Sequence, residues 1–408
     1  MKISLLFGIF PDSQYDCIIN NSIGVIQYAA DALQKSIIEG FIQNDTEFSL
    51  VNLPYIGSYP KRYKKLCSDG YSFSLTDNGK HILCSNVSFN NLTGFKLYSR
   101  FLNAKKGLIN HFLQVPSDEV KVIVIYAVHT PFLKACIEVK NKIQNVKIVL
   151  IVPDLPEYMG HESNFLLDKL HSYNQSLLNK YYSQVDGFVL LSSYMADRLK
   201  VEKRPWTVVE GIYNKIDDPA LEEWNKKERY ILYTGTLARR YGILNLVQAF
   251  MATKDSQVKL FICGAGDSEE EIRKLAAIDN RIVYKGQVKR EQALELQRHA
   301  TLLVNPRTPE GEFTKFSFPS KTMEYLASGV PTLLYQLPGI PSEYYEYCYS
   351  LKDLSIEAFT TAIDSILSKS DSELKMMGQR ARDFILREKN PQKQVAKVVD
   401  LINKVVVS

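Results

Sequence analysis

The segment FTKFSFPSKTMEYLASGVP, residues 313–331, combines residue types that could bind an anion where a helix begins. Ser317 is a candidate N-cap, Pro319 is tolerated in a first helical turn, and Lys321 places a cation where the helix dipole disfavours one. A phosphate bound by the free N–H groups of that turn would neutralise the lysine. Glu324 follows one turn later, where a carboxylate could accept both hydroxyls of a ribose. The alternative interpretation is an ordinary capped helix with a surface lysine and glutamate.

Two further loops carry residues suited to a diphosphate. TGTLARRYGI, residues 234–243, places Gly235 after an apolar run and then Arg240, whose guanidinium could bind a diphosphate through two hydrogen bonds and stabilise it as a leaving group. ICGAGDSEEE places Gly264 and Gly266 at the same kind of junction, which is weak evidence alone because tight turns between strand and helix need glycine anyway. Three such loops on one sheet edge favour a nucleotide diphosphate.

Continuous apolar runs alternate with helical segments along the chain. The first half contains KISLLFGIF, EFSLVNL, VKVIVIYAV, VKIVLIV and GFVLLS, and the second contains RYILYTG, QVKLFICG, RIVYKG, TLLVNP and PTLLY. Runs without alternation predict parallel strands covered on both faces, and hence two doubly wound, Rossmann-like α/β domains. Residues 211–228 are polar and interrupt this rhythm, so we expect a first domain over residues 1–210 and a second over 211–390. The apolar spacing near the C-terminus predicts an amphipathic helix.

Composition excludes several classes of protein. The 408 residues are 45% hydrophobic and 23% charged, as in an ordinary soluble globular protein, and the net charge of +5 is too small to indicate nucleic-acid binding. The apolar N-terminus is too short for a signal peptide and no window reaches a membrane span, so we expect a cytoplasmic protein. The six cysteines are scattered without a CxxC pair, which argues against a metal or disulfide framework.

Positive charge is concentrated in two segments of the first half. Residues 60–65, PKRYKK, hold four cations, and residues 95–113 mix cations with large apolar side chains. Such a combination could lie on an anionic membrane surface at the inner face of the membrane. The alternative interpretation is a solvated helix whose apolar face packs on its own domain.

The first half also contains candidates for handling an acceptor. The run NNSIG, residues 20–24, predicts a flexible loop before a helix, although Gly24 could be a simple turn glycine. His129 follows an expected strand, where it could be structural or functional. Asp154 and Glu157 lie in a loop braced by proline, and either could accept a hydroxyl proton or act as a turn residue.

The runs GTLARRYGI, CGAGDSEEE, VYKGQV, NPR and EFTKFSFPSKTMEYLASGVPTL together resemble the donor domain of retaining glycosyltransferases of the GT4 family, which have the GT-B fold. They look closest to bacterial members that build capsular polysaccharide or exopolysaccharide. The resemblance covers residues 228–345, and the first 200 residues match only in layout. It implies two domains facing a central cleft, a UDP- or GDP-sugar bound there without a metal or other cofactor, and a C-terminal helix, residues 391–408, that crosses back to the first domain.

The same resemblance implies roles for single residues. Arg240 and Lys321 would hold the diphosphate, Glu324 would bind the ribose, and Gly24 would face the phosphates from the first domain. The residues expected to bind the nucleotide are Gly24, Gly235, Thr236, Arg240, Gly264, Ser317, Pro319, Ser320, Lys321 and Glu324.

The chain departs from the family at one position of the expected catalytic machinery. Many members carry a second glutamate eight residues before Glu324, facing the donor sugar, whereas this chain has Phe316 there and Glu312 is the nearest substitute. His129 resembles a family histidine near the sugar hydroxyls. The catalytic candidates are therefore His129, Asp154, Glu312 and Arg240.

The expected reaction transfers a sugar to a hydroxyl of a glycan or lipid-linked acceptor in bacterial surface polysaccharide synthesis. No pair of carboxylates supports double displacement, so the resemblance implies front-face substitution with retention, assisted by the leaving diphosphate. A nucleotide-sugar epimerase would use the same architecture without an acceptor site. A noncatalytic nucleotide-binding subunit of a glycosyltransferase would explain Phe316, but Arg240, Lys321 and Glu324 argue against it.

Overall fold

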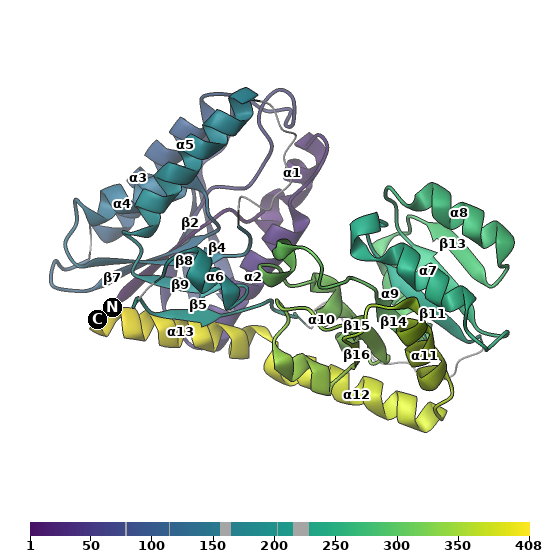
Figure 1. Ribbon diagram of the computed structural model, residues 1–408. Helices are drawn as coiled ribbons and strands as arrows, with labels where there is room; N and C mark the ends of the chain where they lie inside the picture. The colour runs from purple at the N-terminus through teal and green to yellow at the C-terminus, as the bar shows by residue number, and fades with distance from the viewer. Residues whose placement is uncertain (78–79, 114, 156–164, 202, 215–227) are drawn as a thin grey trace. The chain divides into compact units, whose positions relative to one another are not determined.

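The computed structural model describes residues 1–408 except 78–79, 114, 156–164, 202 and 215–227 (Figure 1). The chain divides into two compact units. The first comprises Met1–Ile212 together with Pro391–Ser408, and the second comprises Tyr213–Asn390. Each unit is a sheet covered by helices on both faces, which is the architecture that the apolar runs predict.

The sheet of the first unit has the strand order β10-β9-β8-β7-β1-β2-β5-β4. Its parallel strands are β1 (Lys2–Phe7), β2 (Phe48–Asn52), β5 (Lys80–Asn86), β7 (Lys121–Tyr126), β8 (Val146–Val152), β9 (Gly187–Leu190) and β10 (Trp206–Val208). The edge strand β4 (Tyr71–Asp77) pairs antiparallel with β5, and β3 (Cys67–Ser68) pairs antiparallel with β6 (Phe89–Asn90). The antiparallel edge was not predicted from the sequence, because β4 alternates polar and apolar residues and β5 has only three consecutive apolar residues, 82–84.

Helices cover both faces of this sheet. The C-terminal helix α13 (Pro391–Val407) packs beside α2 (Tyr28–Gln43), and both share one core with β1, β2, β7 and β8 (Figure 1). A Cβ on Gly40 would lie 2.4 Å from the Pro391 carbonyl oxygen, so glycine is needed for this close helix contact. The other face carries α3 (Lys96–Phe112), α4 (Thr130–Lys140) and α5 (Phe165–Tyr182), while α1 (Tyr15–Asn21) and α6 (Tyr194–Arg198) are short.

The second unit contains a wholly parallel sheet with the strand order β13-β12-β11-β14-β15-β16. Its strands are β11 (Tyr230–Thr234), β12 (Lys259–Cys263), β13 (Ile282–Gly286), β14 (Leu302–Asn305), β15 (Thr332–Tyr335) and β16 (Tyr349–Leu351). Its helices are α7 (Ile243–Met251), α8 (Glu269–Ile278), α9 (Arg290–His299), α10 (Ser320–Ala327), α11 (Ile356–Leu367) and α12 (Asp371–Glu388). The strand order reverses between β11 and β14, and ligands of doubly wound sheets bind at such a switch point, beyond the carboxyl ends of the strands.

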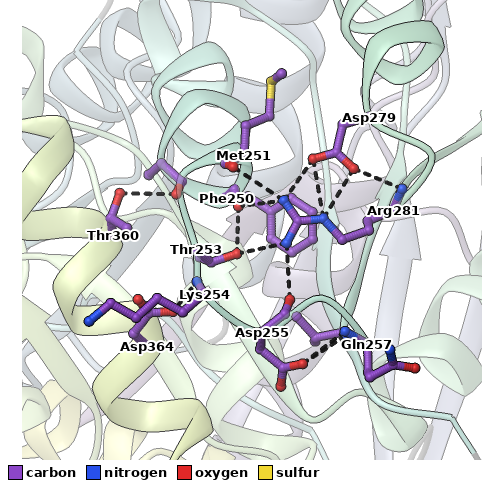
Figure 2. A network of polar contacts seen from close by, with 12 residues as sticks. Phe250, Met251, Thr253, Lys254, Asp255, Gln257, Asp279, Arg281, Thr360 and Asp364 are labelled. Carbon is purple, nitrogen blue, oxygen red and sulfur yellow. Dashed lines mark hydrogen bonds and ion pairs between the residues drawn. The ribbon is translucent and has the colours of Figure 1, made fainter.

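Arg281 braces the opposite end of this second sheet (Figure 2). Its guanidinium forms an ion pair of 2.7 Å with Asp279 and donates to the carbonyl oxygens of Met251 and Asp255 at 3.2 and 3.0 Å. The arginine thereby ties the end of α7 to the start of β13. Because these contacts lie at the amino end of the strands, the brace supports the fold and is remote from the loops that could bind a ligand.

In the part of the chain that the structure describes, no helix has the length and apolar character needed to cross a membrane.

Candidate functional site

Three loops of the second unit meet at the carboxyl ends of β11, β12 and β14. Gly264 has a φ of +141°, and a Cβ there would lie 1.8 Å from the Gly235 carbonyl oxygen. Gly242 has a φ of +74°, and its Cβ would lie 2.2 Å from the Pro306 carbonyl oxygen. These glycines let backbones touch, so packing of the loops explains them even without a ligand.

The two arginines that follow Gly235 have different environments. Arg239 forms an ion pair with Glu271, and its backbone N–H donates to Asp267 at 2.8 Å. Arg240 is exposed, and its guanidinium lies 5.0 Å from the ring centroid of Tyr241. Arg239 is therefore engaged within the protein, whereas Arg240 is accessible to a ligand.

A second guanidinium lies beside Arg240 on the same aromatic rings. Arg307 is 4.7 Å from the ring of Phe313 and 5.2 Å from that of Tyr241, while Arg240 is 5.9 Å from Phe313. Burial lowers the pKa of Arg307, and the charge of Arg240 lowers it further, partly offset by Tyr241. The Arg307 Nε is buried without a hydrogen-bond partner among the described residues. Two like charges on one pair of rings repel each other, and an anion would relieve that repulsion.

Sequence reasoning assigned no role to Arg307, although the run NPR contains it. Its position directly after β14 was the available signal, because strand ends of a doubly wound sheet face the ligand. Arg307 Nη2 donates to Ser317 Oγ at 2.9 Å, and Ser317 Oγ donates to the Phe313 carbonyl at 2.8 Å. Ser317 therefore does not cap the following helix, and that prediction was wrong. Pro319 occupies the N-cap position without any side-chain cap, and Ser320 begins α10.

The helix start at α10 carries a three-residue polar cluster. Lys321 Nζ lies 2.7 Å from Glu324 Oε1, and Gln297 Nε2 donates to the same oxygen at 2.6 Å. Gln297 also donates to Thr234 Oγ1 at 3.1 Å, which fixes the cluster to β11. Glu324 thus neutralises Lys321 without a phosphate, so the first-turn lysine alone does not require an anion. A partly exposed pair of this kind contributes about 0–1 kcal/mol, so a ligand can take over either partner.

Gln297 was missed by sequence reasoning because nothing around it forms a motif. Its position on α9, opposite the start of α10, becomes visible only once the sheet has formed. The Gln297 Oε1 is buried without a hydrogen-bond partner among the described residues. The Gln297 side chain holds the Glu324 carboxylate in place from a buried position.

At position 316, where the resemblance implies a glutamate, the chain has a buried phenylalanine. Phe316 is 8% exposed, and the neighbouring Phe318 packs on Tyr344 with 5.3 Å between ring centroids. Glu312 lies on the surface, at the start of the short helix η5 (Glu312–Lys315). A buried phenylalanine cannot supply a carboxylate, and the role of Glu312 stays a prediction.

In the first unit, a pocket of about 390 Å³ lies at the carboxyl ends of β1, β2, β7 and β8. His129 and Asp154 both line it, as do Ser22 and Val25. Gly24, between those two, has a φ of +81° and open space around it. The flexible loop expected over residues 20–24 is wrong in part, because Asn20 and Asn21 end helix α1 and the next helix begins only at Tyr28. Glu157 lies outside the described residues.

His129 faces aromatic rings in this pocket. Its ring lies 4.5 Å from that of Phe132 and 5.6 Å from that of Tyr55, both edge-on. Burial, followed by the charges of Arg100 and Lys96, holds the pKa of His129 well below its ordinary value. The Nδ1 atom is buried with no partner among the described residues. The imidazole is therefore neutral at pH 7 and suited to hydrogen bonding with a hydroxyl.

Comparisons with solved structures identify the fold. A sucrose-phosphate synthase from Thermosynechococcus elongatus is 14% identical and matches all of both chains with a TM-score of 0.61. A trehalose-6-phosphate structure from E. coli, bound with UDP-2-fluoro glucose, is 10% identical, covers 98% of this chain and 99% of the other, and has a TM-score of 0.60. A TarM mutant from S. aureus, in complex with UDP and α-GlcNAc-glycerol, is 12% identical in sequence. The match covers 99% of this chain and 100% of the other, with a TM-score of 0.57. The chain has the GT-B fold.

The sequence comparisons match only part of the chain. Residues 214–384, which lie within the second unit, match the family model of glycosyl transferases group 1. Among curated proteins no sequence matches this chain. The family match thus covers the segment that contains the three loops, Gln297 and the start of α10.

We expect Gly264→Ala to destabilise the second unit by about 2–4 kcal/mol, because the added Cβ would meet the Gly235 carbonyl and the backbone conformation disfavours a side chain. Gly286→Ala is the matched control: its φ is +69°, but a Cβ there has open space, so the cost should be about 1 kcal/mol. Scanning calorimetry of both variants measures the difference. Equal stabilities would contradict the packing role assigned to Gly264.

Proposed function

We propose that the protein is a glycosyltransferase that takes its sugar from a nucleotide diphosphate sugar, a UDP- or GDP-sugar. The observation that carries the proposal is the gathering of Arg240, Arg307 and Lys321 at the carboxyl end of one parallel sheet. The match of residues 214–384 to glycosyl transferases group 1 supports it.

Each group of this cluster has a task in the proposal. Arg240 and Arg307 bind the diphosphate, and Lys321 with the free N–H groups at the start of α10 neutralises its remaining charge. Glu324, held by Gln297, accepts the ribose hydroxyls. With three cations supplied by the protein, we propose that binding needs no metal.

The chemistry proposed is transfer with retention by front-face substitution. The bond between the anomeric carbon and the diphosphate oxygen breaks, and the arginines stabilise the charge that develops on that oxygen. The acceptor hydroxyl attacks from the same face, and its proton passes to the leaving phosphate. The neutral His129 is proposed to hydrogen bond a sugar hydroxyl, while Asp154 and Glu312 remain candidates for orienting the acceptor and donor sugars.

A noncatalytic nucleotide-binding subunit is the second candidate, because Phe316 is buried where the resemblance implies a carboxylate. Such a subunit would bind the nucleotide without transferring sugar. Radiolabel transfer from a UDP- or GDP-sugar by the purified chain separates the two proposals.

We further propose that the acceptor belongs to bacterial surface polysaccharide synthesis and is met at the cytoplasmic face of the membrane. Backbone hydrogen bonds from Tyr59 to Asn91 and from Asn91 to Leu66 place residues 60–65 beside the start of α3. We propose that the exposed apolar side chains and exposed lysines of these segments act as one basic-apolar face, made of Lys61, Lys64, Lys65, Leu66, Leu92, Phe95, Leu97 and Tyr98. Apolar insertion and about 1 kcal/mol per lysine at an anionic surface would bind this face to a membrane.

Of the two consecutive arginines after Gly235, nucleotide binding should depend on Arg240 and not on Arg239. Arg240→Met removes a charged hydrogen-bond donor to the diphosphate and should weaken UDP or GDP binding by about 1.5–3 kcal/mol, a roughly tenfold to hundredfold loss. Arg307→Met should act in the same direction. Arg239→Met is the matched control, since Glu271 already engages that side chain, and EDTA should change nothing. Isothermal calorimetry measures the affinities, and an Arg240→Met protein that binds as tightly as Arg239→Met would sink the diphosphate role.

Membrane binding should depend on the basic-apolar face. The double variant Phe95→Glu with Tyr98→Glu should lose flotation with phosphatidylglycerol vesicles, because both side chains are about half exposed and would carry charge into the lipid. Met376→Glu, at an equally exposed apolar position on α12, is the control. Flotation that is equal with phosphatidylcholine, or unchanged in the double variant, would refute the membrane role.

A further inference from the structure

The two basic segments of the first unit converge on one pocket. Arg62 comes from residues 60–65, and Lys96 and Arg100 come from the first turns of α3. All three line the pocket of about 390 Å³ that also contains His129 and Asp154. Sequence reasoning placed these cations on a surface, but the structure turns part of their charge inward.

Arg100 is 1% exposed, and its contacts with the described residues are to neutral groups. Its Nη1 and Nη2 donate to the carbonyls of Pro54 and Leu53 at 2.7 and 2.8 Å. The guanidinium also lies 4.8–5.2 Å from the rings of Tyr55, Phe89 and Phe132, and its Nε is buried without a hydrogen-bond partner in the described part of the chain. Arg100 therefore shapes the wall of the pocket and leaves its positive charge uncompensated.

Lys96 is a half-buried cation at the start of the same helix. It lies in the first turn of α3, where the helix dipole disfavours a cation, and its Nζ donates to the Ile56 carbonyl. Burial, followed by the charges of Arg100 and Arg62, lowers the pKa of Lys96 to about 7. No carboxylate of the described residues forms an ion pair with Lys96, Arg62 or Arg100. Arg62 is exposed to solvent, but the buried Arg100 and the half-buried Lys96 have no paired carboxylate among the described residues, which costs stability unless an anion joins them.

We infer that the pocket of the first unit binds the phosphate group of an acceptor through Lys96 and Arg62, with Arg100 as a positioning residue. A phosphate monoester fits better than a carboxylate because its two negative charges match the two accessible cations. Asp154 lines the same pocket and would repel a phosphate, so the phosphate lies at the cationic end. The inference rests on the proposed function, whose acceptor it narrows to a phosphate ester. Both a water-soluble sugar phosphate and a lipid phosphate have this group.

Calorimetric titration of the full chain, with and without UDP, tests the inference. The probes are inorganic phosphate, glucose 6-phosphate and dihexanoyl phosphatidic acid below its micellar concentration, with glucose as the uncharged comparison. Lys96→Met and Arg62→Met should each weaken the binding of the phosphate probes about tenfold or more. Lys142→Met, at an exposed lysine of the first unit that lies outside the pocket lining, should bind like the wild type. Circular dichroism and thermal unfolding of Lys96→Met should show an intact fold, since the variant removes an uncompensated charge.

The outcomes distinguish a water-soluble from a lipid-linked acceptor, and they distinguish failure of this inference from failure of the proposed function. Tighter binding of glucose 6-phosphate assigns a water-soluble acceptor, and tighter binding of the phosphatidic acid assigns a lipid-linked one. Failure of every phosphate probe, or binding unaffected by Lys96→Met and Arg62→Met, overturns the inference. Weaker UDP binding by Lys96→Met would also overturn it, because the cations would then serve the donor. A wild-type chain that binds phosphate esters but no nucleotide would instead count against the proposed function.

Discussion

Positive charge without a paired carboxylate among the described residues, at the carboxyl ends of parallel strands, is the constraint on which the candidate site of each unit depends. Parallel strands point every helix N-terminus that follows them toward one edge, so the dipoles there already favour anions. The second unit adds Arg240 and Arg307 over the same two rings, and the first unit adds Lys96 and Arg100 beside its pocket. Cations concentrated in this way raise the free energy of the unliganded protein, and anionic ligands recover that cost.

The charge-paired cluster at the start of α10 and the neutral His129 can both be understood from this concentration of cations. Gln297 donates to Glu324, and Glu324 pairs with Lys321, so these side chains at the helix start are held without a ligand and are ordered in advance for the nucleotide that we propose. His129 is kept neutral by burial and by nearby cations, which suits it to the hydrogen bond with a sugar hydroxyl that we propose. Pre-ordered groups reduce the entropy that binding must overcome.

The doubly wound architecture was predictable because buried parallel strands are continuous apolar runs, and each quoted run contains a strand. The antiparallel edge formed by β4 and β5 was not predictable, because the composition of these two strands resembles that of loops. Loop glycines were located correctly, but the distances at Gly264 and Gly242 show that contact between neighbouring loops already requires them. Arg307 and Gln297 could not be assigned, since their importance comes from side chains brought together only when β11, β14 and α9 lie side by side.

The proposed function requires the second unit to bind a nucleotide diphosphate, and a thermal-shift panel of UDP, GDP, ADP, uridine and guanosine measures that binding without an acceptor. A ligand that binds only the folded state, at about 100 times its dissociation constant, stabilises it by roughly 2.7 kcal/mol. UDP or GDP should raise the unfolding temperature clearly, and the matching nucleoside should raise it little, because the cations are proposed to recognise the diphosphate. No shift with any diphosphate, from a well-folded chain, would contradict it.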